Sequence, residues 1–368
     1  MKIAQVSTFR TECGVGKYCE ELSGVLSKLV DLKVFAEILT PPQTETEPIK
    51  GSEDVVYERC WKRYQNYDVL SQKILEFKPD YVHFQFVSGV YNELAYRTDS
   101  PFQQFVSWLH AHKIKTAFTF HDIPEFFENA PQLKEWYKAL KSKFLVMNPA
   151  QVEGIKKWYP DADVYQIPLG TPEIPNLPRL VSANFLVTQI GFYGADKGML
   201  GIVKAIPNIK IPNLKVTFAG GFHPLASYIH KPYVMECMKT AVKLGVQGKV
   251  NFTNKMLTED EIDQIAVSSN ILILNQQMVF GYSTSASAHR ILMAKRPIVM
   301  STSPKLSEFQ DGVQCLKCTE DKIAETINKL YNDYSLREGL AERAWLYGKE
   351  TTFDKIAKRH VEEVYTLV

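Results

Sequence analysis

The chain is short of cysteine and of net charge, and each shortage excludes a class of protein. Its 368 residues include six cysteines, and the one close pair, Cys315 and Cys318, has no second pair or histidine nearby. This pattern excludes a disulfide framework and favours a reducing compartment, which we expect to be the cytoplasm. The 43 basic residues nearly balance the 41 acidic ones, so the net charge is only +2. We therefore expect no nucleic-acid partner, because such proteins usually carry a strong positive charge.

Long hydrophobic runs and sequence repeats are also missing. The apolar run that begins at Ile3 is too brief for a signal peptide, and no later run is long enough to span a membrane. We find no tandem repeat and no low-complexity tract. With 45% hydrophobic and 23% charged residues, the composition is typical of a soluble protein with a large core. The length predicts two domains.

Short apolar runs alternate with longer stretches of helical period, which predicts an α/β fold with parallel, doubly wound sheets. The runs form two series, at residues 3–7, 34–39, 81–86, 116–121 and 144–147, then at 185–190, 216–219, 250–252, 271–274 and 297–300. Prolines crowd the segment between the two series and disfavour both helix and central strand there. We predict an N-terminal Rossmann-like domain at 1–170, a linker at 171–183 and a C-terminal Rossmann-like domain at 184–350. For the final helix, at 351–368, packing back on the N-terminal domain is one option.

A glycine-rich turn with one lysine follows the first strand of the second series, at residues 191–198. Ligands of such sheets bind at the carboxyl ends of the strands, and backbone N–H groups at a following helix supply donors for phosphate. Gly194 would let a diphosphate approach the backbone, and Lys197 would supply a full positive charge. The alternative is a turn in which glycine serves only steric needs.

A second glycine turn follows the first strand of the N-terminal series and opens a helix. Its residues Gly14, Val15, Gly16 and Lys17 would face a ligand crevice. The spacing matches neither a Walker loop nor the dinucleotide fingerprint. A tight turn without a ligand remains the alternative.

Polar side chains also stand at the ends of other strands. His121 and Asp122 end one N-terminal strand, and Gln85 lies near the end of another. His121 could contact a sugar hydroxyl or a phosphate, or it could be satisfied by backbone groups. In the C-terminal domain, Gly221 ends a strand where a ligand or a helix could approach closely.

A hydroxyl-rich segment precedes a predicted helix in the C-terminal domain. Its members Ser283, Thr284, Ser285 and Ser287 could form an anion site, or they could simply cap the helix. Arg290, further into that helix, could offer paired donors to a diphosphate or pair with a carboxylate.

Taken together, these segments resemble the GT-B glycosyltransferases, and within them the retaining family four of the glycogen-synthase and mannosyltransferase type. The resemblance covers nearly the whole chain and depends on the order and spacing of its motifs. The matching segments are the glycine loop and helix at 11–26, the strand at 78–85, the strand end at 119–122, the segment at 167–170, the donor diphosphate loop at 191–198, the strand end at 216–221 and the nucleotide-sugar helix at 280–299.

The chain departs from the family at three positions that the family uses for the donor. Phe192 stands where the family usually carries an arginine, which leaves Lys197 as the matching cation and Arg290 as a substitute for the missing one. Met278 and Ala286 replace the usual pair of glutamates. These replacements affect contact with the ribose and assistance to the leaving group.

The resemblance implies two Rossmann-like domains facing each other across a cleft, with the donor bound by the C-terminal one and the acceptor by the N-terminal one. The reaction would transfer a sugar from a nucleotide-diphosphate sugar to a hydroxyl of a saccharide or lipid-linked acceptor, with retention. His121, Lys197 and Arg290 are the expected catalytic residues. We expect no cofactor beyond the nucleotide sugar and no metal, since no Asp-x-Asp lies near the site.

Two further questions stay open at the level of sequence. Residues 133–144 mix basic and aromatic side chains at helical spacing, which suits either an anionic membrane surface or an ordinary helix covering a sheet. The alternatives to a transferase are a sugar-nucleotide-binding subunit without activity, or an epimerase or phosphorylase of the same architecture. A simple oxidoreductase is disfavoured because the dinucleotide fingerprint is missing.

Overall fold

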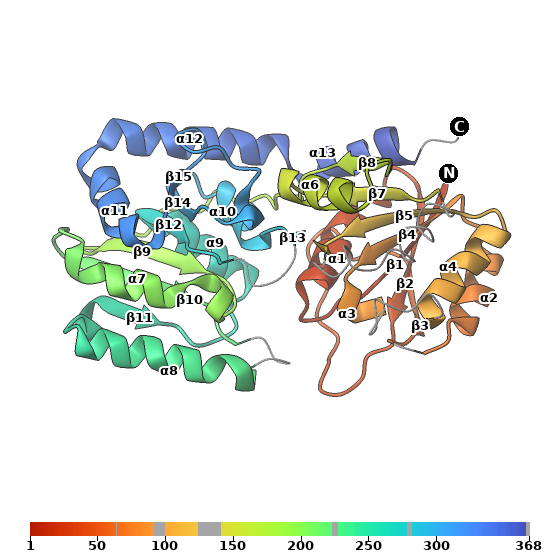
Figure 1. Cartoon of the computed structure of the whole chain (residues 1–368), viewed down its shortest axis with the longest axis horizontal. Coiled ribbons are helices and arrows are strands. Elements are labelled where there is room, and N and C mark those ends of the chain that lie inside the picture. The colour runs from red at the N-terminus through yellow and green to blue at the C-terminus, as the bar shows by residue number, and fades with distance from the viewer. Residues whose placement is uncertain (64, 92–99, 124–140, 223–226, 278–281, 366–368) are drawn as a thin grey trace. The chain divides into compact units, whose positions relative to one another are not determined.

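The computed structural model divides the chain into two compact units, each built around one parallel sheet (Figure 1). It describes residues 1–63, 65–91, 100–123, 141–222, 227–277 and 282–365. Unit 1 comprises Met1–Gly170, Phe280–Thr284 and Phe353–Val368, and unit 2 comprises Thr171–Val279 and Ser285–Thr352. The prediction of two Rossmann-like, doubly wound α/β units is confirmed.

The sheet of unit 1 has seven parallel strands in the order β3-β2-β1-β4-β5-β7-β8. Its central strands are buried on both faces, as a sheet covered by helices on both sides requires. The strands are β1 (Lys2–Ser7), β2 (Asp31–Glu37), β3 (Tyr57–Trp61), β4 (Tyr81–Phe86), β5 (Lys115–Phe120), β7 (Lys143–Val146) and β8 (Val164–Gln166).

Helices cover this sheet, and the described ones begin and end at recognisable signals. For example, α4 starts with a capping box between Ser100 and Gln103 and has proline at its first position. The helices are α1 (Gly14–Leu26), α2 (Asp68–Phe77), α3 (Ser88–Tyr91), α4 (Pro101–Ala111), α6 (Pro149–Trp158) and α13 (Phe353–Arg359), the last continued by a π-helical turn at His360–Val364.

The C-terminal segment belongs to unit 1. The side chains of Phe353, Ile356 and Tyr365 are buried in one hydrophobic cluster with Tyr18 and Leu22 of α1. This burial explains why the end of the chain lies with the N-terminal unit, where α13 packs on α1. Figure 1 labels both helices.

The sheet of unit 2 has six parallel strands in the order β11-β10-β9-β12-β14-β15. The strands are β9 (Phe185–Ile190), β10 (Leu214–Ala219), β11 (Val250–Phe252), β12 (Ile271–Leu274), β14 (Ile298–Ser301) and β15 (Leu316–Cys318). The helices are α7 (Met199–Ala205), α8 (Ser227–Lys243), α9 (Glu259–Ser268), α10 (Ala286–Leu292), α11 (Ile323–Asn332) and α12 (Tyr334–Glu350). Short 3₁₀ turns lie between them, including η2 (Ala195–Lys197) and η5 (Pro304–Leu306).

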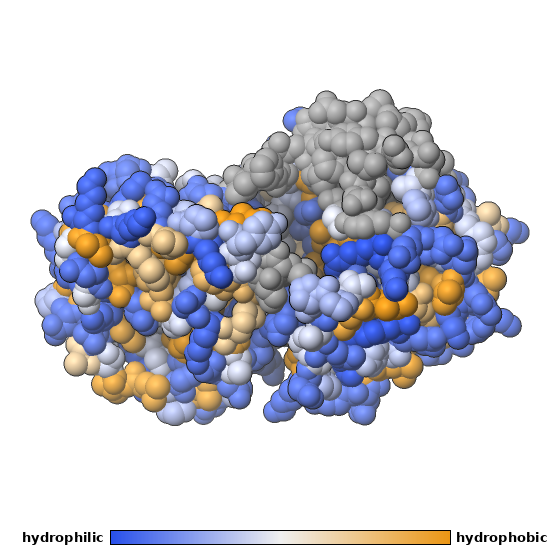
Figure 2. Space-filling view, turned by 90° about the horizontal axis from the view of Figure 1, so that it is seen from below, coloured by the Kyte–Doolittle hydropathy of each residue, from blue (hydrophilic) through white to orange (hydrophobic). Residues whose placement is uncertain are grey.

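Among the residues that Figure 2 colours by hydropathy, hydrophobic and hydrophilic ones are interspersed on each unit. The exposed hydrophobic side chains include Tyr228, Met235 and Val242 of α8. Within the described ranges, we find no helix of the length and apolar character that crossing a membrane requires. Most of the basic and aromatic segment at 133–144 lies outside the described residues.

Candidate functional site

The sheet of unit 2 reverses its winding between β9 and β12. The chain passes from β9 through α7 to β10 on one side, while β12 lies on the other side of β9. Loops that leave the carboxyl ends of two such strands run in opposite directions and leave a crevice, which is where doubly wound sheets bind ligands. The glycine-rich loop at 191–198 follows β9 and therefore lies at this crevice.

Polar side chains beneath the loop fix its backbone. The Nε2 atom of Gln189 donates to the carbonyl oxygen of Lys197 at 2.9 Å. After the end of β12, the side-chain amide of Asn275 donates to the carbonyl oxygen of Gly198 at 2.8 Å. The backbone N–H of Gln277 donates to the carbonyl oxygen of Asp196 at 2.7 Å. The loop is thus held in one conformation by both strands of the crevice.

The glycines of this region are required by the packing of the protein itself. Gly198 has a φ of +60°, and a Cβ there would lie 2.1 Å from the carbonyl oxygen of Asn275. A Cβ on Gly220 would lie 2.1 Å from the carbonyl oxygen of Gly191, and one on Gly221 would lie 2.8 Å from the backbone of Lys255. The steric alternative therefore accounts for these glycines, and a ligand role for the loop depends on its lysine.

Lys197 shares an acidic partner with a second lysine. Its Nζ atom lies 3.2 Å from Oδ2 of Asp196, and the Nζ atom of Lys305 lies 3.7 Å from the same oxygen. Lys305 comes from η5, which follows β14, and burial is the main reason that its pKa is lowered. Sequence reasoning missed this residue, although a polar segment after a strand of the same sheet was a signal that could have pointed to it.

The hydroxyl-rich segment is divided between the two units. Ser283 and Thr284 lie in unit 1, where β13 (Tyr282–Ser283) pairs with β6 (Asp122–Ile123) in an antiparallel ladder. Ser285 belongs to unit 2 and caps α10, accepting a hydrogen bond from the N–H of Ala288 at 3.2 Å. The prediction that all these hydroxyls belong to the C-terminal domain is therefore wrong for Ser283 and Thr284.

The surroundings of Ser287, Ala286 and Gly194 are also described. The hydroxyl of Ser287 lies beside Gly191, 2.9 Å from where a Cβ would stand. Ala286 is the first residue of α10, at the position where the family resemblance leads one to expect a glutamate. Met278, the other such position, lies outside the described residues. Gly194 lies in the loop itself, and a Cβ there would meet the side chain of Asp196 at 2.5 Å.

Arg290 is engaged by carboxylates of α9. Its Nη2 atom lies 2.6 Å from Oδ1 of Asp263 and 2.9 Å from Oε2 of Glu259. Burial raises the pKa of Asp263 to about 6, against the opposing effect of the arginine. Pairing with a carboxylate was the alternative interpretation of this arginine, and both contacts are observed. A contact of Arg290 with a diphosphate stays a prediction.

Unit 1 has its own reversal of winding, between β1 and β4, and polar side chains gather beside it. His121 follows β5, and its Nε2 atom lies 2.9 Å from Oε1 of Gln85 on β4. Its ring forms a T-shaped contact with the ring of Tyr18 of α1, with the ring centroids 5.1 Å apart. Burial lowers the pKa of His121 to about 3, so its imidazole is neutral near pH 7.

The amide of Gln85 is incompletely satisfied. The residue has no exposed surface, and its buried Nε2 atom has no hydrogen-bond partner among the residues that the structure describes. Since Oε1 of Gln85 accepts from Nε2 of His121 in this arrangement, Nδ1 of the histidine is the acceptor end of the ring. The pair therefore retains one amide donor, which is buried, and one ring acceptor. Asp122, the next residue, contributes its backbone to the pairing of β6 with β13.

The four residues of the N-terminal glycine turn form the first turn of α1. A Cβ on Gly16 would lie 3.2 Å from Oγ1 of Thr11, whereas one on Gly14 would meet nothing within 4 Å. Val15 and Lys17 are half-buried. Thr11 is buried, and within the described part of the chain its Oγ1 atom has no hydrogen-bond partner. The neighbouring hydroxyl of Thr11 thus gives a packing reason for Gly16, and Gly14 has no packing reason of this kind.

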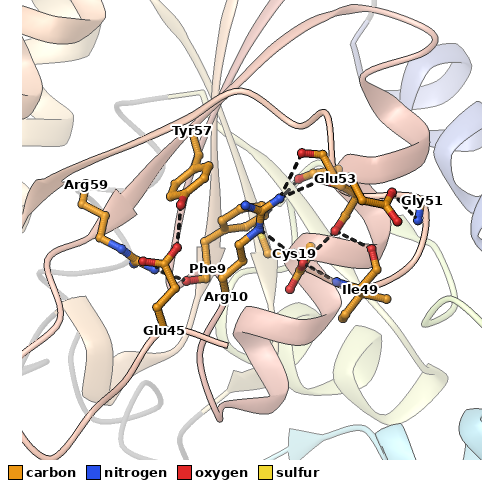
Figure 3. Close-up of polar contacts among 12 residues, drawn as sticks. Phe9, Arg10, Cys19, Glu45, Ile49, Gly51, Glu53, Tyr57 and Arg59 are labelled. Carbon is orange, nitrogen blue, oxygen red and sulfur yellow. Dashed lines mark hydrogen bonds and ion pairs between the residues drawn. The ribbon is translucent and has the colours of Figure 1, made fainter. Parts of the chain in front are cut away.

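A buried arginine holds the segment that leads into this turn (Figure 3). Arg10 follows β1 with a φ of +46°, and its Nη2 atom donates to the carbonyl oxygen of Ser52 at 2.9 Å. Its Nε atom lies 3.5 Å from Oε1 of Glu20 on α1, which also accepts from the N–H of Ile49 at 2.8 Å. These contacts tie residues 49–52 to both β1 and α1.

A neighbouring cluster fixes the other part of the same loop, as Figure 3 shows around Glu45. The hydroxyl of Tyr57 donates to this carboxylate, and Nη2 of Arg59 lies 3.3 Å from it. The hydrogen bond from Tyr57 is the main reason that the pKa of Glu45 is lowered. Arg59 also donates to the carbonyl oxygen of Phe9 at 3.1 Å, so both clusters converge on the start of the glycine turn.

The two units together have the GT-B fold of glycosyltransferases. No family model matches the sequence, and no curated protein matches it. Among solved structures, a glycosyltransferase from Rickettsia africae matches with a TM-score of 0.76 at 13% identity, over 99% of this chain and 97% of that chain. HepE from Anabaena, solved with UDP, matches with a TM-score of 0.75 at 14% identity over 100% of both chains. Sucrose-phosphate synthase from Thermosynechococcus elongatus matches with a TM-score of 0.72 at 14% identity over 98% of both.

Proposed function

We propose that this protein is a glycosyltransferase that moves a hexosyl group from a nucleoside-diphosphate sugar to the hydroxyl of a saccharide or lipid-linked acceptor. The observation that carries the proposal is the position of Lys197, in the loop after β9 at the reversal of winding in unit 2. The full-length likeness to glycosyltransferases supports it, as does the HepE structure solved with UDP-glucose.

Lys197 would act on the leaving group. When the bond to the anomeric carbon breaks, negative charge develops on the departing diphosphate, and a fixed cation beside it stabilises the transition state more than the ground state. A lysine in this role makes a carboxylate-bound metal unnecessary. We therefore expect activity without a metal and with no cofactor beyond the nucleotide sugar, and turnover should survive treatment with a chelator.

The residues of unit 1 would position a sugar hydroxyl. The neutral imidazole of His121 would accept a hydrogen bond through Nδ1, and the free Nε2 group of Gln85 would donate one. A hydroxyl is both donor and acceptor, so it suits this pair. Near neutral pH, His121 would orient a hydroxyl rather than transfer a proton to it.

The second candidate is a sugar-nucleotide-binding subunit without activity. The observation in its favour is the replacement of the family's arginine and glutamates by Phe192, Met278 and Ala286. It predicts binding of a nucleotide sugar without release of nucleoside diphosphate. Retention at the anomeric carbon rests on the family resemblance and belongs to the first candidate alone.

Product analysis distinguishes these candidates. The chain is incubated with UDP-, GDP-, ADP- and dTDP-hexoses and a panel of saccharide and lipid-linked acceptors, and the released nucleoside diphosphate and the new glycosidic bond are measured. The transferase predicts acceptor-dependent release, with Lys197→Ala slower by about a hundredfold and the exposed-lysine control Lys204→Ala unchanged. Conversion of the sugar without an acceptor would indicate an epimerase, and binding without any release would favour the inactive subunit.

A further inference from the structure

Lys305 is fixed close to the donor loop of unit 2. It is the middle residue of η5, whose neighbour Leu306 is completely buried. The hydroxyl of Ser303 caps this turn by accepting a hydrogen bond from the N–H of Lys305 at 3.4 Å. The backbone of Lys305 is therefore anchored, and only 15% of its side chain is exposed.

One carboxylate oxygen lies close to the ammonium groups of two lysines beside the donor loop. Oδ2 of Asp196 lies 3.2 Å from Nζ of Lys197 and 3.7 Å from Nζ of Lys305. The two nitrogens are consequently at most about 7 Å apart, which is within one Debye length at physiological salt. The three side chains together carry a net positive charge.

The charge balance of this cluster is unfavourable for Lys305. Taking an ammonium group out of water is costly unless opposite charge compensates it, and here a single carboxylate is shared. Burial and the nearby charge of Lys197 both lower the pKa of Lys305, and Asp196 only partly opposes them. An anion with negative charge on two adjacent groups would restore the balance.

We propose that Lys197 and Lys305 form a clamp for the two phosphates of the donor, with Lys305 supplying the second cation of the site. The inference rests on the proposed function and adds Lys305 to its donor site, although this residue lies far from the loop at 191–198 in the sequence. It also explains how the site can work with Phe192 at the position of the family's arginine. Arg290, the other residue considered for that task, is occupied by Asp263 and Glu259.

Asp196 has two opposing effects on anion binding in this arrangement. It holds both ammonium groups at the loop and competes with an incoming diphosphate for them. Removing its charge should therefore tighten the binding of an anion, whereas removing a lysine should weaken it. A purely structural ion cluster would not produce these opposite effects.

The test is calorimetric titration of inorganic pyrophosphate and of UDP, GDP, ADP and dTDP into the full chain and its variants. Lys305→Gln should bind both kinds of ligand at least about tenfold more weakly, as expected for the loss of one charged hydrogen bond. Lys305→Arg should stay within about threefold of the wild type because it keeps the charge. Asp196→Asn should bind several-fold more tightly, and the exposed-lysine control Lys204→Gln should not change.

The outcomes separate this inference from the proposed function. If the wild type binds a nucleoside diphosphate and Lys305→Gln binds it equally well, the clamp is refuted and the proposed function stands. If the wild type binds none of these ligands, the proposed function itself fails. If thermal unfolding shows that Lys305→Gln does not fold, the decision falls to Asp196→Asn, because weaker binding by that variant would refute the clamp.

Discussion

Acidification should destabilise unit 1 because its buried histidines stay neutral in the folded state. His360 is 1% exposed, and burial lowers its pKa from 6.5 to about 4. His83 is completely buried between Tyr365 and Thr119, and burial lowers its pKa well below the ordinary value. Both groups gain a proton on unfolding once the pH falls below about 6.5.

The size of the effect follows from proton linkage. At pH 7 the unfolded and folded states of His360 bind nearly the same number of protons, so the group contributes little pH dependence. At pH 5 the unfolded histidine is almost fully protonated while the folded one is not, which favours unfolding. Between these pH values His360 alone should remove about 2 kcal/mol of unfolding free energy. His83 adds a loss of the same sign.

Urea unfolding at pH 7 and pH 5, followed by tryptophan emission, measures this loss. Four of the five tryptophans belong to unit 1, so the signal reports mainly on that unit. The loss between the two pH values should be smaller by about 2 kcal/mol in His360→Gln, and it should be unchanged in His110→Gln, whose histidine is exposed. An equal loss in His360→Gln and in the wild type would refute the reasoning.

Three further predictions concern packing and charge in each unit. Gly170→Ala should lower the unfolding free energy of unit 1 by about 1–3 kcal/mol, because the new Cβ would lie 2.3 Å from the ring of Phe353; a urea midpoint equal to that of the wild type would contradict this. Gly198→Ala should cost more than about 1 kcal/mol in unit 2 because of its φ of +60°, and nucleotide binding should weaken with it. Gly248→Ala is the matched control, since a Cβ there meets nothing within 4 Å, and equal thermal stability of these two variants would contradict the prediction. The carboxyl of Asp263, whose pKa is raised from 3.8 to about 6, should stabilise unit 2 by about 1 kcal/mol as the pH falls from 7 to 5. Asp263→Asn should abolish that gain in hydrogen-exchange measurements on unit 2, and persistence of the gain would disprove its assignment.

The central strands were predictable from sequence because they are buried on both faces and appear as continuous apolar runs. The predicted runs at 81–86, 185–190 and 271–274 match the observed central strands at both ends. The run at 250–252 matches β11, which is a partly buried edge strand. Three edge strands, β3, β8 and β15, were not predicted. They have three to five residues and are only partly buried, so their hydrophobic signal is weak.

The site was only partly predictable because its sequence signals are local and its contacts are not. The loop at 191–198 could be found from a strand, a glycine turn and a lysine in succession. The pairing of Ser283 with Asp122 in unit 1 depends on a contact between distant segments, and so do the partners of Arg290. Lys305 joins Lys197 only because β14 and β9 lie in one sheet.

A calorimetric titration tests the donor site of unit 2 most directly. UDP, GDP, ADP and dTDP are titrated into the wild type and into Lys197→Ala. One nucleotide should bind the wild type, and the variant should bind it at least about tenfold more weakly, while Lys204→Ala binds as the wild type does. Equal binding by Lys197→Ala, or no binding of any nucleotide at millimolar concentration, would contradict the assignment of this loop to a nucleoside diphosphate.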